Sequence, residues 1–224
     1  TYTFQNISFN GQATGTRVAL RSSSAGTVWN IAVAGTRSVS NTDVKDSSAC
    51  SQPPDIDATD GTNKDSGNNP CWATGYLTVS LSPTDTVSLG TLDTSNVNQA
   101  SMTSTVTTTA ASGYVSTAYY NATLTSGSYT IPDADGSIAP ASSEFGASTD
   151  DTTSVDLSTT SNSCSTGTGT YNATALSTTA QTFASEAAPA TSDVTTLCFS
   201  AGISTTQAPG SYMSTVTIVT TGKF

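Results

Sequence analysis

The sequence has no histidine, only three lysines and three arginines, and no long apolar run. Without histidine there can be no Ser-His-Asp triad, no Cys-His dyad and no imidazole ligand for a metal ion. The 6 basic and 16 acidic side chains give a formal net charge of -10, so the chain cannot neutralise a run of phosphates. Nucleic acid is therefore excluded as a partner. None of the apolar runs approaches the roughly 20 residues of a membrane-spanning helix, so no membrane span is expected.

Small hydroxyl side chains dominate what is present. Of the 224 residues, 45 are Thr and 36 are Ser. Threonine is β-branched and suits a pleated sheet, whereas serine and glycine suit turns. About ten short alternating apolar segments, spaced about 8 to 15 residues apart, are typical of a sandwich of antiparallel strands. The sequence therefore predicts an all-β fold, with one weak helical signal over residues 180–188. It also predicts a hairpin made of residues 101–110 and 113–127, with its turn at residues 111–113.

The pattern divides the chain into an N-terminal strand and one larger domain. Residues 1–10 form a strand candidate in which Tyr2 and Phe4 alternate, and the alternation then changes phase to Ile7 and Phe9. A change of phase indicates a β-bulge or a register shift. We expect one β-sandwich domain over residues 11–224. Within it, residues 41–71 are rich in Asp, Ser, Asn, Pro and Gly, which predicts a long loop.

The cysteines point to an oxidising compartment. The chain has four, Cys50, Cys71, Cys164 and Cys198, with no C-x-x-C pair and no histidine to complete a zinc site. An even number of widely spaced cysteines is typical of disulfides in secreted proteins. Pairing Cys50 with Cys71 and Cys164 with Cys198 is the simplest of the three connectivities, and the other two stay open. The chain begins with Thr, and we expect an extracellular or cell-surface protein whose signal peptide has been removed.

One polar stretch has the oxygen-rich character of a calcium site. It contains Asp55, Asp57, Asp60 and Asp65, but the spacing departs from the EF-hand pattern and Lys64 lies among the carboxylates. The same residue types also make ordinary solvated turns. We expect a plain loop and no cofactor, with structural Ca²⁺ as the less favoured alternative.

The acidic residues do not suggest catalysis. The chain has only two glutamates, Glu144 and Glu186, and scattered aspartates such as Asp133 and Asp135. Nothing in the pattern brings two of these carboxylates together as a glycosidase needs. Serine is abundant, but no general base accompanies it. We therefore expect that the protein is not an enzyme.

Two kinds of surface feature remain as candidates. Aromatic side chains could form a sugar-binding platform, although buried packing is the commoner role of tyrosine in a β-fold. These candidates are Tyr76, Tyr119 and Tyr120. Three sequons of the form N-x-S/T could accept glycans, and chance alone would place one or two in a chain this rich in Ser and Thr. The candidate glycosylation sites are Asn121, Asn172 and Asn6.

Four phrases of the sequence resemble ordered landmarks of known surface proteins. They are VSLGTLDTS, STVTTTAASGYVSTAYYNATLTSGSYTIP, SSEFGAS and APGSYMSTVTIVTTGKF. In this order they are similar to the strands of Ser/Thr-rich secreted bacterial surface proteins, and the last is also similar to the closing strand of pilin-like modules. Archaeal filament subunits share the low charge and the high Thr content. The resemblance covers about residues 72–224 and implies an antiparallel β-sandwich of immunoglobulin-like or pilin-like type.

The resemblance implies a structural or adhesive surface protein. The N-terminal strand, with Tyr2, Phe4, Ile7 and Phe9, could complete its own sheet or add to the open groove of the next subunit. The second arrangement, repeated head to tail, would produce a homopolymeric filament or pilus by donor-strand complementation. The expected partners are other copies of the chain and a host or neighbouring cell surface. The alternative is a monomeric adhesin or a carbohydrate-binding module of a larger surface protein.

Overall fold

The computed structural model describes residues 1–12, 14–60, 62–110, 112–154, 156–160 and 162–223. Its regular structure is β-strand throughout, apart from one 3-10 turn, η1 (Thr14–Thr16). The prediction of an all-β fold is confirmed. The chain divides into two compact units, where the sequence predicted one sandwich over residues 11–224. Unit 1 comprises Thr1–Leu77, Thr108–Gly113 and Gly222–Phe224, and unit 2 comprises Thr78–Thr107 and Tyr114–Thr221.

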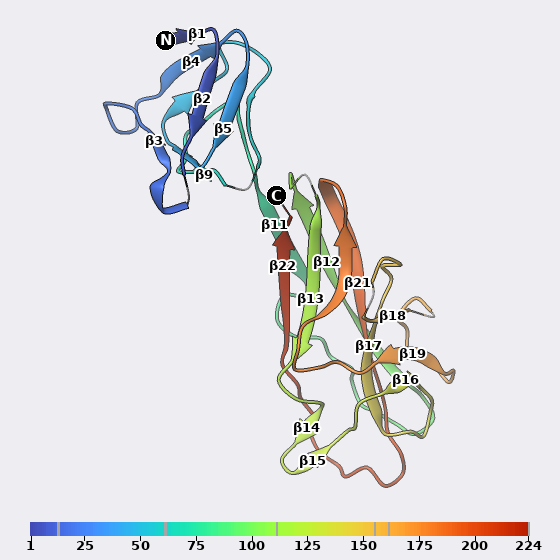
Figure 1. The fold of residues 1–224 in the computed structure, drawn as a ribbon. Coiled ribbons are helices and arrows are strands. Elements are labelled where there is room, and N and C mark those ends of the chain that lie inside the picture. The colour runs from blue at the N-terminus through green and yellow to red at the C-terminus, as the bar shows by residue number, and fades with distance from the viewer. Residues whose placement is uncertain (13, 61, 111, 155, 161, 224) are drawn as a thin grey trace. The chain divides into compact units, whose positions relative to one another are not determined.

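The strands of unit 1 pair in parallel, and the chain visits three stacks of strands in turn (Figure 1). The first stack contains β1 (Tyr2–Phe4), β4 (Trp29–Val33) and β7 (Ser47–Ser48). In the second stack β2 (Ile7–Asn10) pairs with β5 (Arg37–Ser40), which lies against β8 (Ile56–Ala58), and β8 pairs with β10 (Trp72–Thr74). The third contains β3 (Val18–Leu20), β6 (Thr42–Val44) and β9 (Lys64–Asp65). Each circuit lies on the one before it, which is the arrangement of a parallel β-helix.

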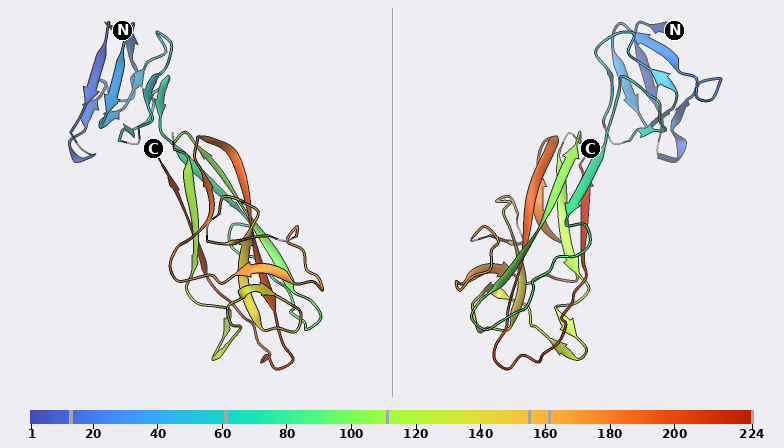
Figure 2. Two further views of the ribbon diagram at one scale, coloured as in Figure 1. Left: turned by 45° about the vertical axis from the view of Figure 1, so that its right-hand side comes forward. Right: turned by 180° about the vertical axis from the view of Figure 1, so that it is seen from behind.

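The interior of this β-helix is one apolar cluster. The residues buried in it are Ile7, Ile31, Val33, Val39, Val44, Ala49, Ile56, Ala58 and Trp72. Apolar side chains stack on each other from one circuit to the next, because parallel pairing places Phe9 opposite Val39 and Leu20 opposite Val44. The left view of Figure 2 shows the strands of unit 1 side by side in this stack.

The prediction of a long loop over residues 41–71 is wrong, because this segment contains strands β6 to β9. Its asparagines hydrogen-bond to the backbone of the neighbouring circuit. The side-chain carbonyl of Asn63 accepts from the backbone N–H of Thr42 at 2.9 Å, and that of Asn69 accepts from the backbone N–H of Ser47 at 3.1 Å. The polar residues that led to the prediction of a loop therefore hydrogen-bond one circuit to the next.

Both predicted disulfides are confirmed. Cys50 and Cys71 are joined within unit 1, with their Cα atoms 5.0 Å apart, and Cys164 and Cys198 are joined within unit 2 at 5.6 Å. Two disulfides indicate an oxidising environment of the kind found outside the cell.

Unit 2 consists of two main sheets. The larger has the strand order β11-β12-β21-β17-β19-β16, with β18 paired to β17, and the smaller has the order β20-β13-β22. The larger sheet contains β11 (Leu77–Ser82), β12 (Asn98–Thr108), β16 (Asp135–Ile138), β17 (Glu144–Thr149), β18 (Ser158–Thr159), β19 (Tyr171–Thr174) and β21 (Ala190–Gly202). The smaller contains β13 (Tyr114–Tyr120), β20 (Gln181–Glu186) and β22 (Val216–Gly222). The ribbon β14 (Thr125–Ser126) and β15 (Tyr129–Thr130) lies outside both sheets.

The two sheets of unit 2 form two layers around an apolar core (Figures 1 and 2). Buried and partly exposed residues alternate along all seven positions of β13, as expected of a strand with one face in the core. Tyr114 and Phe183 are fully buried on the smaller sheet, and Leu197 is fully buried on the larger. The layers and the mainly antiparallel pairing are consistent with the predicted sandwich.

Two local predictions in unit 2 are wrong. The helical signal over residues 180–188 falls on strand β20, which pairs with β13. The segments now assigned to β12 and β13 read as a hairpin, but they belong to different sheets. The turn proposed for that hairpin includes Ala111, which lies outside the described residues.

Removal of the unit 1 disulfide provides a test of the β-helix. Both tryptophans of the chain, Trp29 and Trp72, lie in unit 1, so tryptophan fluorescence reports on this unit. We expect Cys50→Ser/Cys71→Ser to lower its stability by about 3 kcal/mol, because the closed loop has a sequence separation of 21. Denaturant titration monitored by tryptophan fluorescence measures this loss. An unchanged tryptophan transition would contradict the role given to this disulfide.

A buried tyrosine predicts how unit 2 responds to alkali. The hydroxyl of Tyr120 donates to the Asp133 carboxylate at 2.6 Å, and burial together with this bond raises the pKa of Tyr120 to about 12. Because tyrosine in an unfolded chain ionises near pH 10, the stabilisation is complete below pH 10 and is lost as the pH rises toward 12. We expect Tyr120→Phe to flatten the fall of melting temperature between pH 10 and pH 12. Tyr129→Phe, at a side chain that is 56% exposed, is the matched control and should leave the fall unchanged.

Candidate functional site

The N-terminal segment, residues 2–10, lies along an edge of unit 1. Strand β1 pairs only with β4 and strand β2 pairs only with β5 among the described residues, so each keeps one edge unpaired. The change of phase that the sequence shows between Phe4 and Ile7 corresponds to the break between β1 and β2. At the break the Asn6 side-chain carbonyl accepts from the backbone N–H and the hydroxyl of Thr36.

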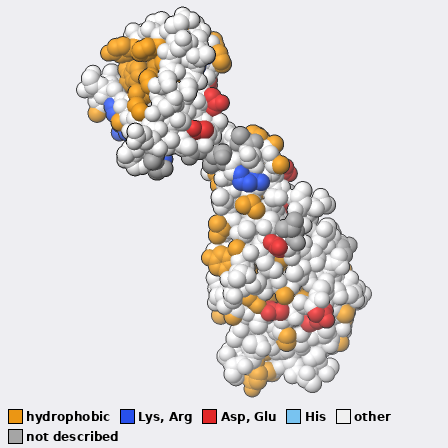
Figure 3. Space-filling view, viewed as in Figure 1, with side chains coloured by type: hydrophobic (Ala, Val, Ile, Leu, Met, Phe, Trp, Pro, Cys, Tyr) orange, Lys and Arg blue, Asp and Glu red, His pale blue; other side chains and the backbone are white. Residues whose placement is uncertain are grey.

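The four apolar residues predicted for this segment differ in burial. Tyr2 is 63% exposed and Phe4 is 39% exposed, and Figure 3 shows hydrophobic side chains at the surface near β1 and β4. The ring of Tyr2 meets that of Trp29 edge to face, with the centroids 5.8 Å apart. Phe9 is partly buried, and only Ile7 belongs to the buried core of unit 1. The segment thus contributes one buried side chain, Ile7, and one partly buried ring, Phe9, to the core of its own unit.

Unit 2 has an apolar groove that the sequence analysis did not predict. It has a volume of about 1180 Å³, above the roughly 300–1,000 Å³ that is usual for small-molecule pockets. Its floor is formed by Met102, Leu124, Phe145 and Phe199, all buried. The rings of Phe145 and Phe199 stack with their centroids 6.5 Å apart.

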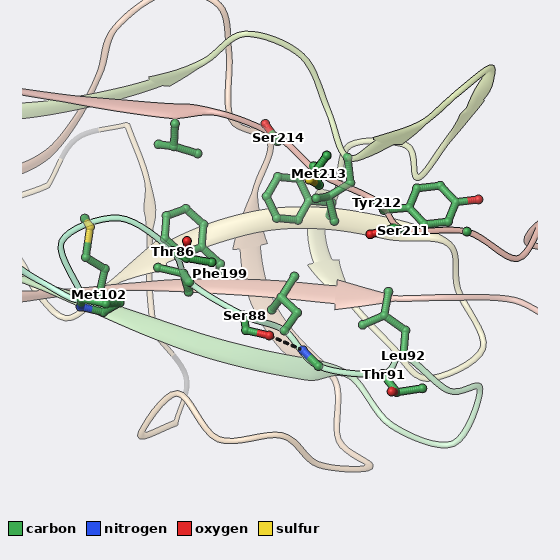
Figure 4. Close-up of a pocket in the computed structure, with 18 of the residues that line it drawn as sticks. Thr86, Ser88, Thr91, Leu92, Met102, Phe199, Ser211, Tyr212, Met213 and Ser214 are labelled. Carbon is green, nitrogen blue, oxygen red and sulfur yellow. Dashed lines mark hydrogen bonds between the residues drawn. The ribbon is translucent and has the colours of Figure 1, made fainter.

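Two segments, each largely outside regular strands, form the walls of this groove. One is residues 83–92, and the other is residues 210–218, which include the start of β22. Figure 4 shows Thr86 and Ser88 on the first wall, Ser211 and Ser214 on the second, and the Phe199 ring between them. Figures 1 and 2 place β11 and β22 at the same edge of the two layers. Both strands contribute to the lining of the groove, β11 through Leu81 and β22 through Val216 and Ile218.

Both walls keep unpaired backbone. Residues 86–90 belong to no strand, and no backbone–backbone hydrogen bond joins residues 83–92 to the rest of the described chain. On the opposite wall, β22 pairs only with β13 among the described strands, which leaves its other edge open. Unpaired strand edges are the usual sites at which a further strand is added to a sheet.

A buried amide positions the wall of residues 83–92. The side-chain N–H groups of Asn98, on β12, donate to the backbone carbonyls of Leu89 at 2.8 Å and Thr91 at 3.0 Å. Asn98 is 8% exposed. This wall has no strand partner among the described strands, and these two bonds join its backbone to the larger sheet.

The two units differ in charge. All six Lys and Arg lie in unit 1, where six of the acidic residues balance them, and the other ten acidic residues lie in unit 2. Unit 2 therefore has a formal charge of -10 and no basic side chain. In unit 1 the Arg21 guanidinium lies 2.7 Å from the Asp43 carboxylate. Burial opposes ionisation of Asp43, but the Ser66 hydroxyl and Arg21 hold its pKa below the usual value.

The calcium candidates are not gathered into a site. No three His, Cys, Asp or Glu side chains within the described ranges are grouped so that they could hold a metal ion. Asp57 and Asp60 accept from the backbone N–H groups two residues further on, as in ordinary turns, and Asp65 accepts from the N–H of Gly67. Asp55 is exposed, and Lys64 lies on β9 with its ammonium group 3.8 Å from Asp43.

The sequons differ in how their asparagines are engaged. The Asn172 side-chain N–H donates to the Thr159 carbonyl at 3.1 Å. Asn121 is exposed, and its side-chain carbonyl accepts from the backbone N–H of Thr215. Asn6 is bonded through its side-chain carbonyl, as described above. Glycosylation at these three positions stays a prediction.

The remaining candidates have separate environments. Tyr76 is 47% exposed, Tyr119 is partly buried and Tyr120 is buried, so these tyrosines do not form one exposed platform. Glu144 lies on β17 and Glu186 on β20, on different sheets. In the described part of the chain no helix is long and apolar enough to cross a membrane.

Replacing the buried amide tests the wall of residues 83–92. We expect Asn98→Ala to destabilise unit 2 by about 1–3 kcal/mol, because it leaves two carbonyls without their donor. Thermal unfolding followed by near-ultraviolet circular dichroism measures the loss. Asn96→Ala is the matched control, since Asn96 bonds only to the surface carboxylate of Asp93. Equal effects of the two substitutions would contradict the positioning role of Asn98.

Comparisons of the chain with protein-family models, with curated proteins and with solved structures find no match.

Proposed function

We propose that this protein is a structural subunit of an extracellular filament or pilus that serves cell-surface attachment. Its subunits join head to tail when residues 2–10 of one copy leave their own unit 1 and pair with the neighbouring copy. The proposal rests on three properties of residues 2–10. The segment is uncharged, it is rich in apolar side chains, and its strands are paired along one edge only.

The energetics of the segment favour such an exchange. Leaving unit 1 removes Ile7 from the buried core and also removes Phe9, which packs against that core and is partly buried. Inserting the segment into a neighbour can bury Tyr2 and Phe4, which are 63% and 39% exposed in their own unit. Full burial of an exposed large apolar side chain contributes roughly 1.5–3 kcal/mol. Burying the exposed parts of Tyr2 and Phe4 in the neighbour, where Ile7 and Phe9 are buried again, can offset what the segment loses in unit 1. The backbone hydrogen bonds broken in unit 1 are replaced by bonds to the neighbour.

The composition supports an extracellular structural role. The two disulfides suit an oxidising compartment. Only 10% of the residues are charged, and the chain has no basic residue between Lys64 and Lys223. A surface made of hydroxyl groups and dispersed carboxylates keeps such a protein soluble without ion-pair networks.

A reversible covalent lock tests the exchange. Ser8 and Ser38 are directly paired on β2 and β5, and both are exposed. Cα atoms paired across parallel strands lie about 5 Å apart, within the range that a disulfide spans. We expect oxidised Ser8→Cys/Ser38→Cys to remain monomeric, because its segment cannot leave unit 1, and to form filaments after mild reduction. Negative-stain electron microscopy and light scattering measure assembly.

Two controls separate the lock from its side effects. The alkylated Ser38→Cys variant keeps the segment free, and the unmodified protein in the same reductant reports any effect on the native disulfides. Filaments formed equally by the oxidised variant would show that residues 2–10 are not exchanged. A monomer at all concentrations for the unmodified protein would overturn the filament proposal itself.

The second candidate is a monomeric adhesin or carbohydrate-binding module. Two separate tyrosines, Tyr76 and Tyr129, are 47% and 56% exposed, and exposed aromatic rings can stack on sugars. A glycan array probed with the monomeric protein tests this alternative, which predicts loss of binding in Tyr76→Ser or Tyr129→Ser.

A further inference from the structure

The groove of unit 2 identifies where an exchanged segment binds. We infer that it is the acceptor site for residues 2–10 of a second copy of this chain, an inference that rests on the proposed function. The floor of the site is the cluster Met102, Leu124, Phe145 and Phe199, and the walls are residues 83–92 and 210–218.

The walls are suited to a polypeptide strand. Residues 83–92 make no backbone–backbone hydrogen bond to the rest of the described chain. On the second wall Met213 exchanges two backbone hydrogen bonds with Thr125 of β14, but one edge of β22 has no strand partner among the described strands. A strand lying between them can hydrogen-bond to one or both walls, which no small apolar ligand can do. The apolar floor then receives side chains from one face of that strand, while the other face stays in solvent.

The segment and the second wall of the groove contain the same number of residues. The wall of residues 210–218 contains nine residues and spans about 30 Å if extended, at about 3.3 Å per residue. Residues 2–10 also number nine and span the same length. One β-bulge at Gln5 and Asn6 places all four apolar side chains of the segment on one face, toward the floor.

The charges of the two parts are compatible. Residues 1–11 contain no acidic side chain, whereas unit 2 has ten acidic residues and no basic one. Among the residues that line the groove, Asp85 is the one carboxylate. An acidic strand would be repelled by unit 2, and an uncharged strand is not.

A peptide tests the acceptor site apart from assembly. The acceptor is the oxidised Ser8→Cys/Ser38→Cys protein, whose own segment is held in unit 1 and whose groove is unchanged. The probe is a fluorescent peptide, TYTFQNISFN, which corresponds to residues 1–10. We expect saturable binding by fluorescence anisotropy. We expect at least tenfold weaker binding of a control peptide in which Phe4, Ile7 and Phe9 are replaced by serine.

A groove variant locates the binding. Thr86 is an exposed wall residue, so Thr86→Trp fills the groove without altering the core of unit 2. We expect it to weaken peptide binding at least tenfold. The matched control is Ser128→Trp, in the exposed turn between β14 and β15, which should bind the peptide as the parent does. Circular dichroism checks that both variants are folded.

The outcomes distinguish this inference from the proposed function. Filaments that form normally from Thr86→Trp, or peptide binding unaffected by Thr86→Trp, would overturn the acceptor site while leaving a filament subunit in place. No binding of the peptide to the locked protein would also overturn it. Peptide binding at the groove by a protein that never forms filaments would overturn the proposed function and leave the acceptor site in place.

Discussion

Backbone hydrogen bonding along strand edges determines which strands of this molecule are already paired and which could still accept a further strand. In unit 1 each circuit satisfies the edge of the circuit below it, and the apolar cluster inside is sealed as the strands stack. With 10% charged residues, the chain relies on neutral side-chain amides where backbone pairing fails. Asn63 and Asn69 bond to the backbone of a neighbouring circuit, and Asn98 holds a wall that has no strand partner. Two of the places where edges remain unpaired, residues 2–10 and the walls of the unit 2 groove, are the places from which we argue assembly.

The sequence identified the strand-rich class and the disulfides, because both leave direct signals. Alternation along β13 and the spacing of the four cysteines are local patterns. The β-helix was missed for a physical reason. Parallel circuits need no alternation and no fixed repeat, and here the paired residues are 30 apart for Ile7 and Arg37 but 16 apart for Ile56 and Trp72. Strands of two or three polar residues, bonded by asparagines, look like turns.

The candidate site was only partly predictable. The apolar pattern of residues 2–10 is visible in the sequence, and so are Val87 and Leu89 on the wall of the groove. The sequence does not show whether a segment lacks a strand partner, because an alternating segment has the same pattern whether or not its edges are paired. Asn98 positions the wall by donating hydrogen bonds to the carbonyls of Leu89 and Thr91, and no local sequence motif predicts these bonds.

The segregation of charge has a consequence for the filament that we propose. Each unit 2 carries ten carboxylates and no cation, so a filament assembled as we propose would be a polyanion. Repulsion between neighbouring filaments reaches about 10 Å at 0.1 M salt and about three times as far at 0.01 M. In dilute medium such filaments would stand apart as separate fibres. In concentrated salt they would approach closely enough for their hydroxyl-rich surfaces to touch and bundle.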